Sequence, residues 1–176
     1  MRGLVATAPE YRLESVHHTP PERCVEDGKS AIRWLRMNAR HLGIDTRRMI
    51  AGGGSSGASI AAFTAYNTAF EPDDEDRSIS PGPNALVLLN PAFGCPPCAV
   101  MASWKVTKGG PPAILFYGTE DPLQDAGRDF ARQLIAVGTR AEFYTAAGHS
   151  SIASQTRHGT LSCSGRLICS WLRSAI

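Results

Sequence analysis

The sequence predicts an α/β fold in which a mostly parallel sheet of about five strands is covered by helices on both faces. Short, continuously apolar segments such as Ala85–Asn90 and Ala113–Tyr117 are typical of strands that are buried on both sides. These segments alternate with longer ones of helical periodicity, such as Asp125–Val137. This alternation indicates helical crossovers between parallel strands.

The first elements follow one another in this order. Gly3–Ala8 is short and apolar and is the first expected strand. The next segment, Tyr11–Arg23, is irregular and contains prolines. A helix is expected over Val25–Leu42, where apolar residues recur along one stripe, and Gly43 is a residue that commonly ends a helix. Arg48–Gly52 is the second expected strand.

The remaining elements continue the alternation of helix and strand. In chain order they are a helix over Ser59–Ala69, strands over Ala85–Asn90 and Ala113–Tyr117, a helix over Asp125–Val137, a strand over Ala141–Thr145 and a helix over Thr160–Ala175.

Length and composition limit the class of protein. A chain of 176 residues favours a single domain over 1–176. The formal net charge is only +2, and no basic stripe with interleaved aromatic residues occurs, so nucleic acid is not an expected partner. No apolar run is long enough for a membrane span. Residues 1–10 lack the apolar core of a signal peptide, so we expect a cytoplasmic location unless a leader has been lost with a missing N-terminus.

The five cysteines do not indicate a disulfide framework, because their number is odd and their spacing irregular. Cys95 and Cys98 form a C-x-x-C motif in a proline-rich loop, and the motif alone assigns them no role. A zinc site would need a second pair of ligands. The acidic run Glu71–Asp76 is interpreted as a solvated loop, and we predict neither a metal nor a cofactor.

The glycine-rich stretch at residues 51–59 fits three different kinds of site. Gly52, Gly54 and Gly57 match the dinucleotide fingerprint G-x-G-x-x-G, and two of them also have the spacing of a phosphate-binding loop. Gly53, Ser55 and Gly57 match G-x-S-x-G, the turn that presents a nucleophilic serine. All three kinds of site place the motif between a strand and a helix, so residues elsewhere in the chain must decide which interpretation holds.

Residues elsewhere in the chain favour the serine motif. A phosphate loop needs a lysine after its last glycine, where this chain has Ala58. A dinucleotide site needs an acid at the end of the next strand, which here ends in Asn90. A nucleophilic serine needs an acid and then a histidine, each just beyond a strand end. Asp121 and His149 meet that requirement.

Because the carboxyl ends of parallel strands meet at one edge of a sheet, Ser55, Asp121 and His149 are expected to converge there as a catalytic triad. Gly53 and Gly57 are expected to keep side chains away from the turn. The backbone N–H of Ser56 is the expected donor to an oxyanion.

Further stretches occur around these residues in a familiar order. They are Tyr11-Arg12-Leu13, Ala31-Ile32-Arg33-Trp34-Leu35, Gly53-Gly54-Ser55-Ser56-Gly57, Tyr117-Gly118-Thr119-Glu120-Asp121 and Gly148-His149. Together they resemble the alpha/beta-hydrolase superfamily, and specifically its hormone-sensitive-lipase-like esterases. The resemblance covers nearly the whole chain, beginning at the family's fourth strand, without the first three strands or the His-Gly-Gly-Gly loop that supplies further oxyanion donors. It therefore implies an N-terminally incomplete alpha/beta-hydrolase fold.

The resemblance implies a serine carboxylesterase acting on small esters. Ser55 would attack the ester, His149 would transfer the proton, and Asp121 would orient the histidine while an acyl-enzyme forms and is hydrolysed. Two alternatives stay open, a catalytically impaired fragment or pseudoenzyme of the same fold, and a serine peptidase of the prolyl-oligopeptidase type. Without the third strand, Gly3–Ala8 either pairs with Arg48–Gly52 or leaves an open edge through which copies of the chain are expected to associate.

Overall fold

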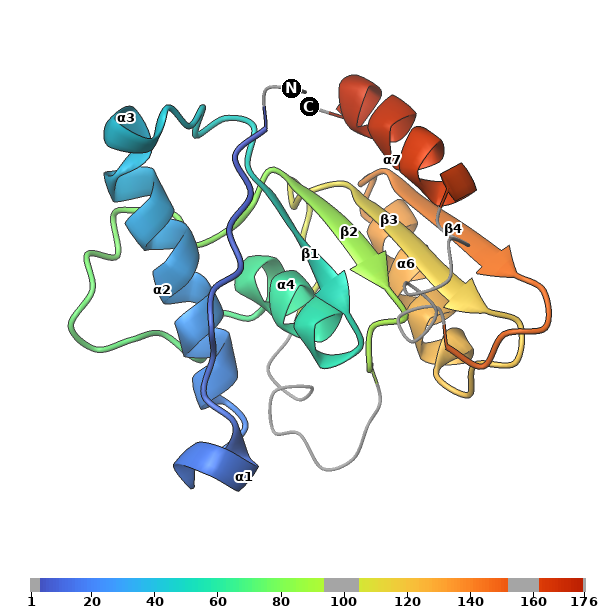
Figure 1. Ribbon diagram of the computed structural model, residues 1–176, viewed down its shortest axis with the longest axis horizontal. Coiled ribbons are helices and arrows are strands. Elements are labelled where there is room, and N and C mark those ends of the chain that lie inside the picture. The colour runs from blue at the N-terminus through green and yellow to red at the C-terminus, as the bar shows by residue number, and fades with distance from the viewer. Residues whose placement is uncertain (1–3, 94–104, 152–161, 176) are drawn as a thin grey trace.

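The computed structural model describes residues 4–93, 105–151 and 162–175, with the backbone alone described for residues 162–166. These residues form an α/β structure around a sheet of four parallel strands in the order β1-β2-β3-β4 (Figure 1). The strands are β1 (Ile50–Gly54), β2 (Ala85–Leu89), β3 (Ala113–Gly118) and β4 (Ala141–Ala146). All four therefore end at the same edge of the sheet.

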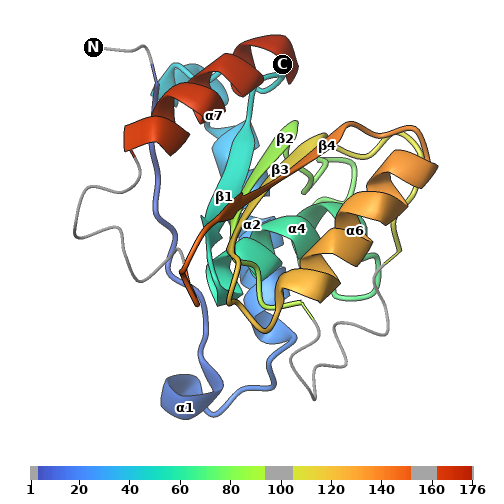
Figure 2. The ribbon, with the colours of Figure 1, turned by 90° about the vertical axis from the view of Figure 1, so that its right-hand side faces the viewer.

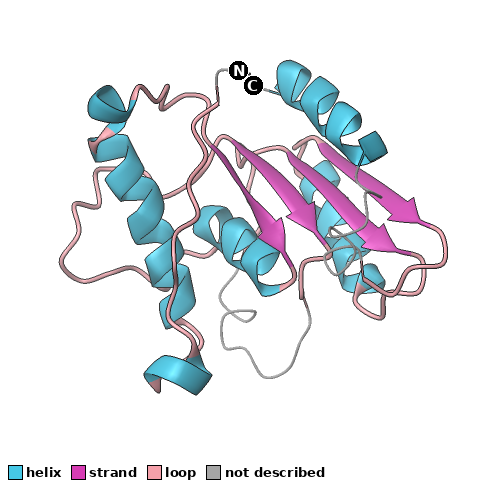
Figure 3. Cartoon of the chain, in the orientation of Figure 1, coloured by secondary structure: helices cyan, strands magenta, loops and turns pink. Residues whose placement is uncertain are grey.

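Helices cover both faces of the sheet, as predicted (Figures 2 and 3). Helices α4 (Ser56–Tyr66) and α6 (Gln124–Ala136) pack on one face, and α7 (Ser162–Ala175) packs on the other. Helix α2 (Arg23–Met37) lies against α4, and the short helices α1 (Glu14–His17) and α3 (Ala39–Leu42) flank it. Among the described residues, no helix combines the length and the apolarity needed to cross a membrane.

Two apolar clusters hold these layers together. On one side of the sheet, side chains of α4 and α6 pack on alternate residues of the central strands, such as Leu88 and Tyr117. On the other side, Trp171 of α7 packs against Ile114 and Phe116. Strand β3 is buried along its whole length, as expected for a central strand with helices on both sides.

The predicted strand over Gly3–Ala8 is wrong. Residues 4–8 form no strand, and the side chains of Leu4 and Val5 are 73% and 56% exposed. Strand propensity depends on a surface against which side chains can pack, and the neighbouring β1 ends in three glycines that offer none. Within the described residues, β1 therefore has β2 as its only strand neighbour. Association of copies through this edge stays a prediction.

Asparagine side chains set two helix boundaries that periodicity misplaced. The predicted helix over Val25–Leu42 is divided at Asn38, whose side-chain amide donates to the Trp34 carbonyl at 2.8 Å. Helix α4 ends at Tyr66, because the side chain of Asn67 accepts the backbone N–H groups of residues 69 and 70.

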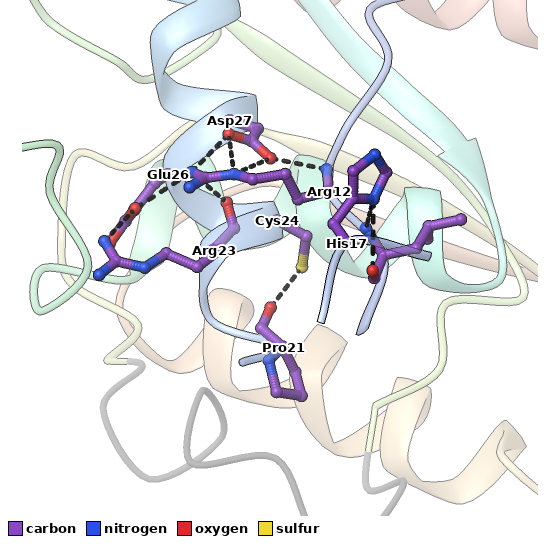
Figure 4. Close-up of polar contacts among 8 residues, drawn as sticks. Arg12, His17, Pro21, Arg23, Cys24, Glu26 and Asp27 are labelled. Atoms are coloured by element: carbon purple, nitrogen blue, oxygen red, sulfur yellow. Dashed lines mark hydrogen bonds and ion pairs between the residues drawn. The ribbon is translucent and has the colours of Figure 1, made fainter. Parts of the chain in front are cut away.

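Ion pairs attach two irregular segments to α2. Arg12 donates to Asp27 at 2.6–3.0 Å and to Glu26 at 3.2 Å, which anchors the segment before α1 (Figure 4). Further along the helix, Lys29 and Arg33 both donate hydrogen bonds of 2.6 Å to Glu71.

The interpretation of residues 71–76 as a solvated loop is therefore wrong at Glu71, since the two cations that bind it are buried.

Candidate active site

Ser55 occupies the turn between β1 and α4 in a backbone conformation that is rare for a residue with a side chain. Its φ is 53° and its ψ is −121°. A non-glycine residue held in such a region typically costs about 1–3 kcal/mol. Its N–H donates to the Leu89 carbonyl of β2 at 2.9 Å, and its carbonyl accepts the Ser59 N–H of α4 at 3.1 Å. The sheet and the helix thus hold an exposed serine in a strained turn.

Close backbone packing accounts for one of the two glycines of the motif. A Cβ at Gly53 would lie 2.8 Å from the Gly57 carbonyl carbon and 3.0 Å from the Ala58 nitrogen, so β1 meets the first turn of α4 there without room for a side chain. At Gly57, a Cβ would have no described atom within 4 Å other than those of its chain neighbours and the backbone of its own helix. The steric reason predicted for both glycines applies at Gly53 and not at Gly57.

The strand register brings the three predicted residues to one edge of the sheet. Gly54, Leu89 and Phe116 are consecutive partners across β1, β2 and β3. Ser55 follows the first of these strands, Asp121 follows β3, and His149 follows β4. At about 4.8 Å per strand, β3 lies about 10 Å from β1.

Asp121 is held in the loop that joins β3 to α6. Asp121 is 7% exposed, and its Oδ1 accepts the Leu123 N–H at 2.9 Å. Its backbone N–H donates to the Gly118 carbonyl at 3.3 Å, and its carbonyl accepts the Gln124 N–H at 3.1 Å. These bonds fix the carboxylate at the start of α6.

His149 lies in the loop after β4, which turns back onto the end of β3. Its carbonyl accepts the Glu120 N–H at 3.0 Å, and the preceding N–H, of Gly148, donates to Thr119 Oγ1 at 3.0 Å. The His149 carbonyl also takes the place that a side chain would need at Gly118. The loops that carry Asp121 and His149 are therefore in direct contact.

The structure brings the acid and histidine loops together, with the serine on the same edge two strands from β3. Among the residues described, no hydrogen bond or ion pair joins the side chains of Ser55, Asp121 and His149. Catalytic hydrogen bonds are often long or misaligned until substrate is bound.

The N-terminus of α4 adds backbone donors beside Ser55. The first N–H groups of a helix have no partner within the helix, and the positive end of the helix dipole lies there. Ser56, the first residue of α4, is exposed at this end. Its N–H is therefore available to a negatively charged oxygen next to Ser55.

Buried polar residues beneath this edge were not singled out from the sequence. The Tyr117 hydroxyl donates to the Pro91 carbonyl at 2.8 Å, and burial, together with the nearby Asp121 charge, raises the pKa of Tyr117. Tyr117 is therefore a neutral donor rather than an acid or base. Asn90, between Ser55 and β3, is buried with a φ of 37°. An asparagine after an apolar run signals this conformation, which asparagine tolerates better than most residues.

The structure describes no group of three or more His, Cys, Asp or Glu side chains placed to hold a metal ion, within residues 4–93, 105–151 and 162–175. Cys95 and Cys98 lie outside the described residues.

Comparisons with known proteins identify relatives of this arrangement. A family model named BD-FAE, for esterases and lipases of the alpha/beta-hydrolase type, matches residues 1–83. A solved structure of a native thermophilic esterase from the planctomycete Thermogutta terrifontis is 29% identical with a TM-score of 0.80, over 93% of this chain and 68% of that one.

Two further structures of esterase 2 from the same organism are similar. The form phosphorylated by paraoxon is 32% identical with a TM-score of 0.78, over 92% of this chain and 68% of that one. The propionate-bound form is 29% identical with a TM-score of 0.75, over 92% of this chain and 70% of that one. No curated protein matches the chain.

Proposed function

The chain belongs to the esterases of the alpha/beta-hydrolase superfamily, and we propose that it hydrolyses small carboxylic esters with Ser55 as nucleophile, His149 as base and Asp121 as the orienting acid. The observation that carries the proposal is the conformation of Ser55. A φ of 53° at an exposed, non-glycine residue between a strand and a helix is strained. Such strain is expected where a hydroxyl must stand clear of the backbone for attack.

The first half of the reaction forms an acyl-enzyme. The Ser55 hydroxyl attacks the ester carbonyl while His149 accepts its proton, and the resulting imidazolium is stabilised by Asp121. His149 then gives the proton to the departing alcohol. In the second half, His149 takes a proton from the water that attacks the acyl group, and it returns this proton to the Ser55 oxygen as the acyl–oxygen bond breaks and the acid leaves.

The tetrahedral intermediates carry a negative oxygen that the end of α4 is suited to stabilise. The Ser56 N–H points out of the helix N-terminus next to the nucleophile, where partial positive charge accumulates. One such donor typically contributes about 10²–10³-fold to turnover.

Short acyl groups are the substrates that the comparisons support best. Similar structures of the Thermogutta terrifontis esterase hold propionate and butyrate, and another is phosphorylated by paraoxon. By analogy with these ligands, we propose that the substrates are esters of short acids with about two to four carbons.

Hydrolysis of p-nitrophenyl acetate, propionate and butyrate tests the proposal. We expect Ser55→Ala to lower kcat by at least about 10³-fold. Ser56→Ala is the matched control, because it removes an adjacent exposed hydroxyl and leaves the backbone N–H in place. It should retain kcat within about threefold. Equal rates for the wild type and Ser55→Ala would contradict the proposal.

A catalytically impaired member of the same family is the second candidate. It is favoured by one observation, that the three side chains are not hydrogen-bonded to one another among the described residues. This candidate predicts that Ser55 is phosphorylated by paraoxon while hydrolysis of all three esters stays at the Ser55→Ala rate. Turnover that depends on Ser55 would exclude it.

A further inference from the structure

We propose that Thr119 is a positioning residue that sets the place of His149 by accepting the Gly148 N–H. The inference rests on the proposed function, because it concerns the base of that reaction. Thr119 Oγ1 lies 3.0 Å from the Gly148 nitrogen, and the Thr119 N–H donates to the Ala146 carbonyl at 2.9 Å. Thr119 thus contacts the chain on the approach to the histidine.

His149 is anchored on both sides by consecutive residues of the acid loop. Thr119 Oγ1 accepts the N–H of Gly148, the residue before His149. The Glu120 N–H donates to the carbonyl of His149 at 3.0 Å. Gly148 has a φ of 72°, which lies in a region that few residues other than glycine adopt. The direction in which the chain enters His149 is therefore set at Gly148. Two anchors around this bend leave the His149 backbone little freedom.

Packing cannot supply this restraint. Residues 147, 148 and 150 are exposed, and His149 is only half-buried. A loop with few buried contacts opens easily unless hydrogen bonds hold it. Of the bonds that join the two loops, the one from Gly148 to Thr119 is made by a side chain, while those of Ala146 and His149 are made by backbone groups. A substitution at Thr119 can therefore remove one anchor without moving the others.

Removal of the anchor should affect catalysis more than folding. A general base must lie within hydrogen-bond reach of the hydroxyl that it deprotonates. A displacement of about 1 Å can lower turnover by about 10²-fold. An exposed N–H that loses its protein acceptor can bind water instead, so the native fold should persist.

Three variants test the inference. Thr119→Val keeps the shape and removes the acceptor, whereas Thr119→Ser keeps the hydroxyl. Ser80→Ala is the control, because Ser80 Oγ accepts the Gly82 N–H at 3.2 Å in an exposed loop shortly before β2, at the opposite edge of the sheet. We expect Thr119→Val to lower kcat by about 10- to 100-fold with KM within about twofold. Thr119→Ser and Ser80→Ala should retain kcat within about threefold.

A second measurement keeps the inference testable if the enzyme proves inactive. NMR should show that Thr119→Val, and neither other variant, increases amide hydrogen exchange at Gly148 and shifts the ring signal of His149. Wild-type exchange and ring signals in Thr119→Val would overturn the inference, as would unchanged kcat. Absence of Ser55-dependent hydrolysis in the wild type would overturn the proposed function instead, and the NMR result would then decide on Thr119 alone.

Discussion

Replacement of Ser55 by glycine should stabilise the protein while abolishing its proposed activity. The φ of 53° and ψ of −121° at Ser55 are strained for any residue with a Cβ. Glycine adopts such angles without steric cost. No hydrogen bond from the Ser55 side chain caps α4, so loss of the hydroxyl removes no helix cap.

The expected gain follows from two opposing contributions. Relief of strain at one residue is worth about 1–3 kcal/mol. Glycine loses more backbone entropy on folding, which costs about 0.5–1 kcal/mol. Ser55→Gly should therefore raise the free energy of unfolding by about 1 kcal/mol, or Tm by about 2–4 °C for a chain of this size.

Urea denaturation of the wild type, Ser55→Ala and Ser55→Gly measures this gain. Ser55→Ala keeps the Cβ, so it keeps the strain and should match the wild type within about 0.5 kcal/mol. Both variants should be inactive. If Ser55→Gly is less stable than Ser55→Ala, the turn is not strained, and the observation that carries the proposed function loses its meaning.

Three further results are expected. Glu71→Gln should lower the free energy of unfolding by about 3 kcal/mol, because it leaves buried Lys29 without its carboxylate partner and leaves buried Arg33 with Glu75 alone. Asp45→Asn, in an exposed ion pair, should cost less than about 1 kcal/mol in the same urea titration. Burial alone would raise the pKa of Glu71, but hydrogen bonds from those cations outweigh it and lower the pKa, so the stabilisation by Glu71 is full above the unfolded pKa of about 4.3 and is lost as pH falls through the folded value. Between pH 5 and pH 3 (roughly the range that spans both values) the wild type should therefore lose more stability than Glu71→Gln, and parallel loss would contradict the pairing. Gly53→Ala should lower kcat by about 10-fold or more, because a Cβ 2.8 Å from the backbone of α4 must displace the turn that carries Ser55. Circular dichroism should show that the variant is still folded, and turnover at the wild-type rate would refute this prediction.

The sequence was sufficient to predict the parts of the fold that depend on continuous apolar runs. Strands β2, β3 and β4 begin at the predicted residues and end within one residue of the predicted ends. A strand that is buried on both faces forms a continuous apolar run, so its first and last residues can be recognised in the sequence. Residues 4–8 have a similar composition, but they pair with no strand in the part of the chain that the structure describes. An apolar run alone does not report whether a neighbouring strand is present.

Contacts between distant segments were beyond prediction from one sequence. Glu71 lies in an acidic run that is indistinguishable from a solvated loop until α2 brings two buried cations to it. The bond from Gly148 to Thr119 joins residues 29 positions apart and depends on β3 and β4 being neighbours. The position of Ser55 could be predicted, because a glycine motif between a strand and a helix specifies its own local turn.

Phosphorylation by paraoxon, followed by peptide mass mapping, tests most directly whether Ser55 is a nucleophile activated by His149. We expect a stoichiometric adduct on the peptide that contains Ser55, its loss in Ser55→Ala, and much slower labelling in His149→Gln. An adduct on a different residue, or labelling at the wild-type rate in His149→Gln, would show that Ser55 is not a nucleophile activated by His149.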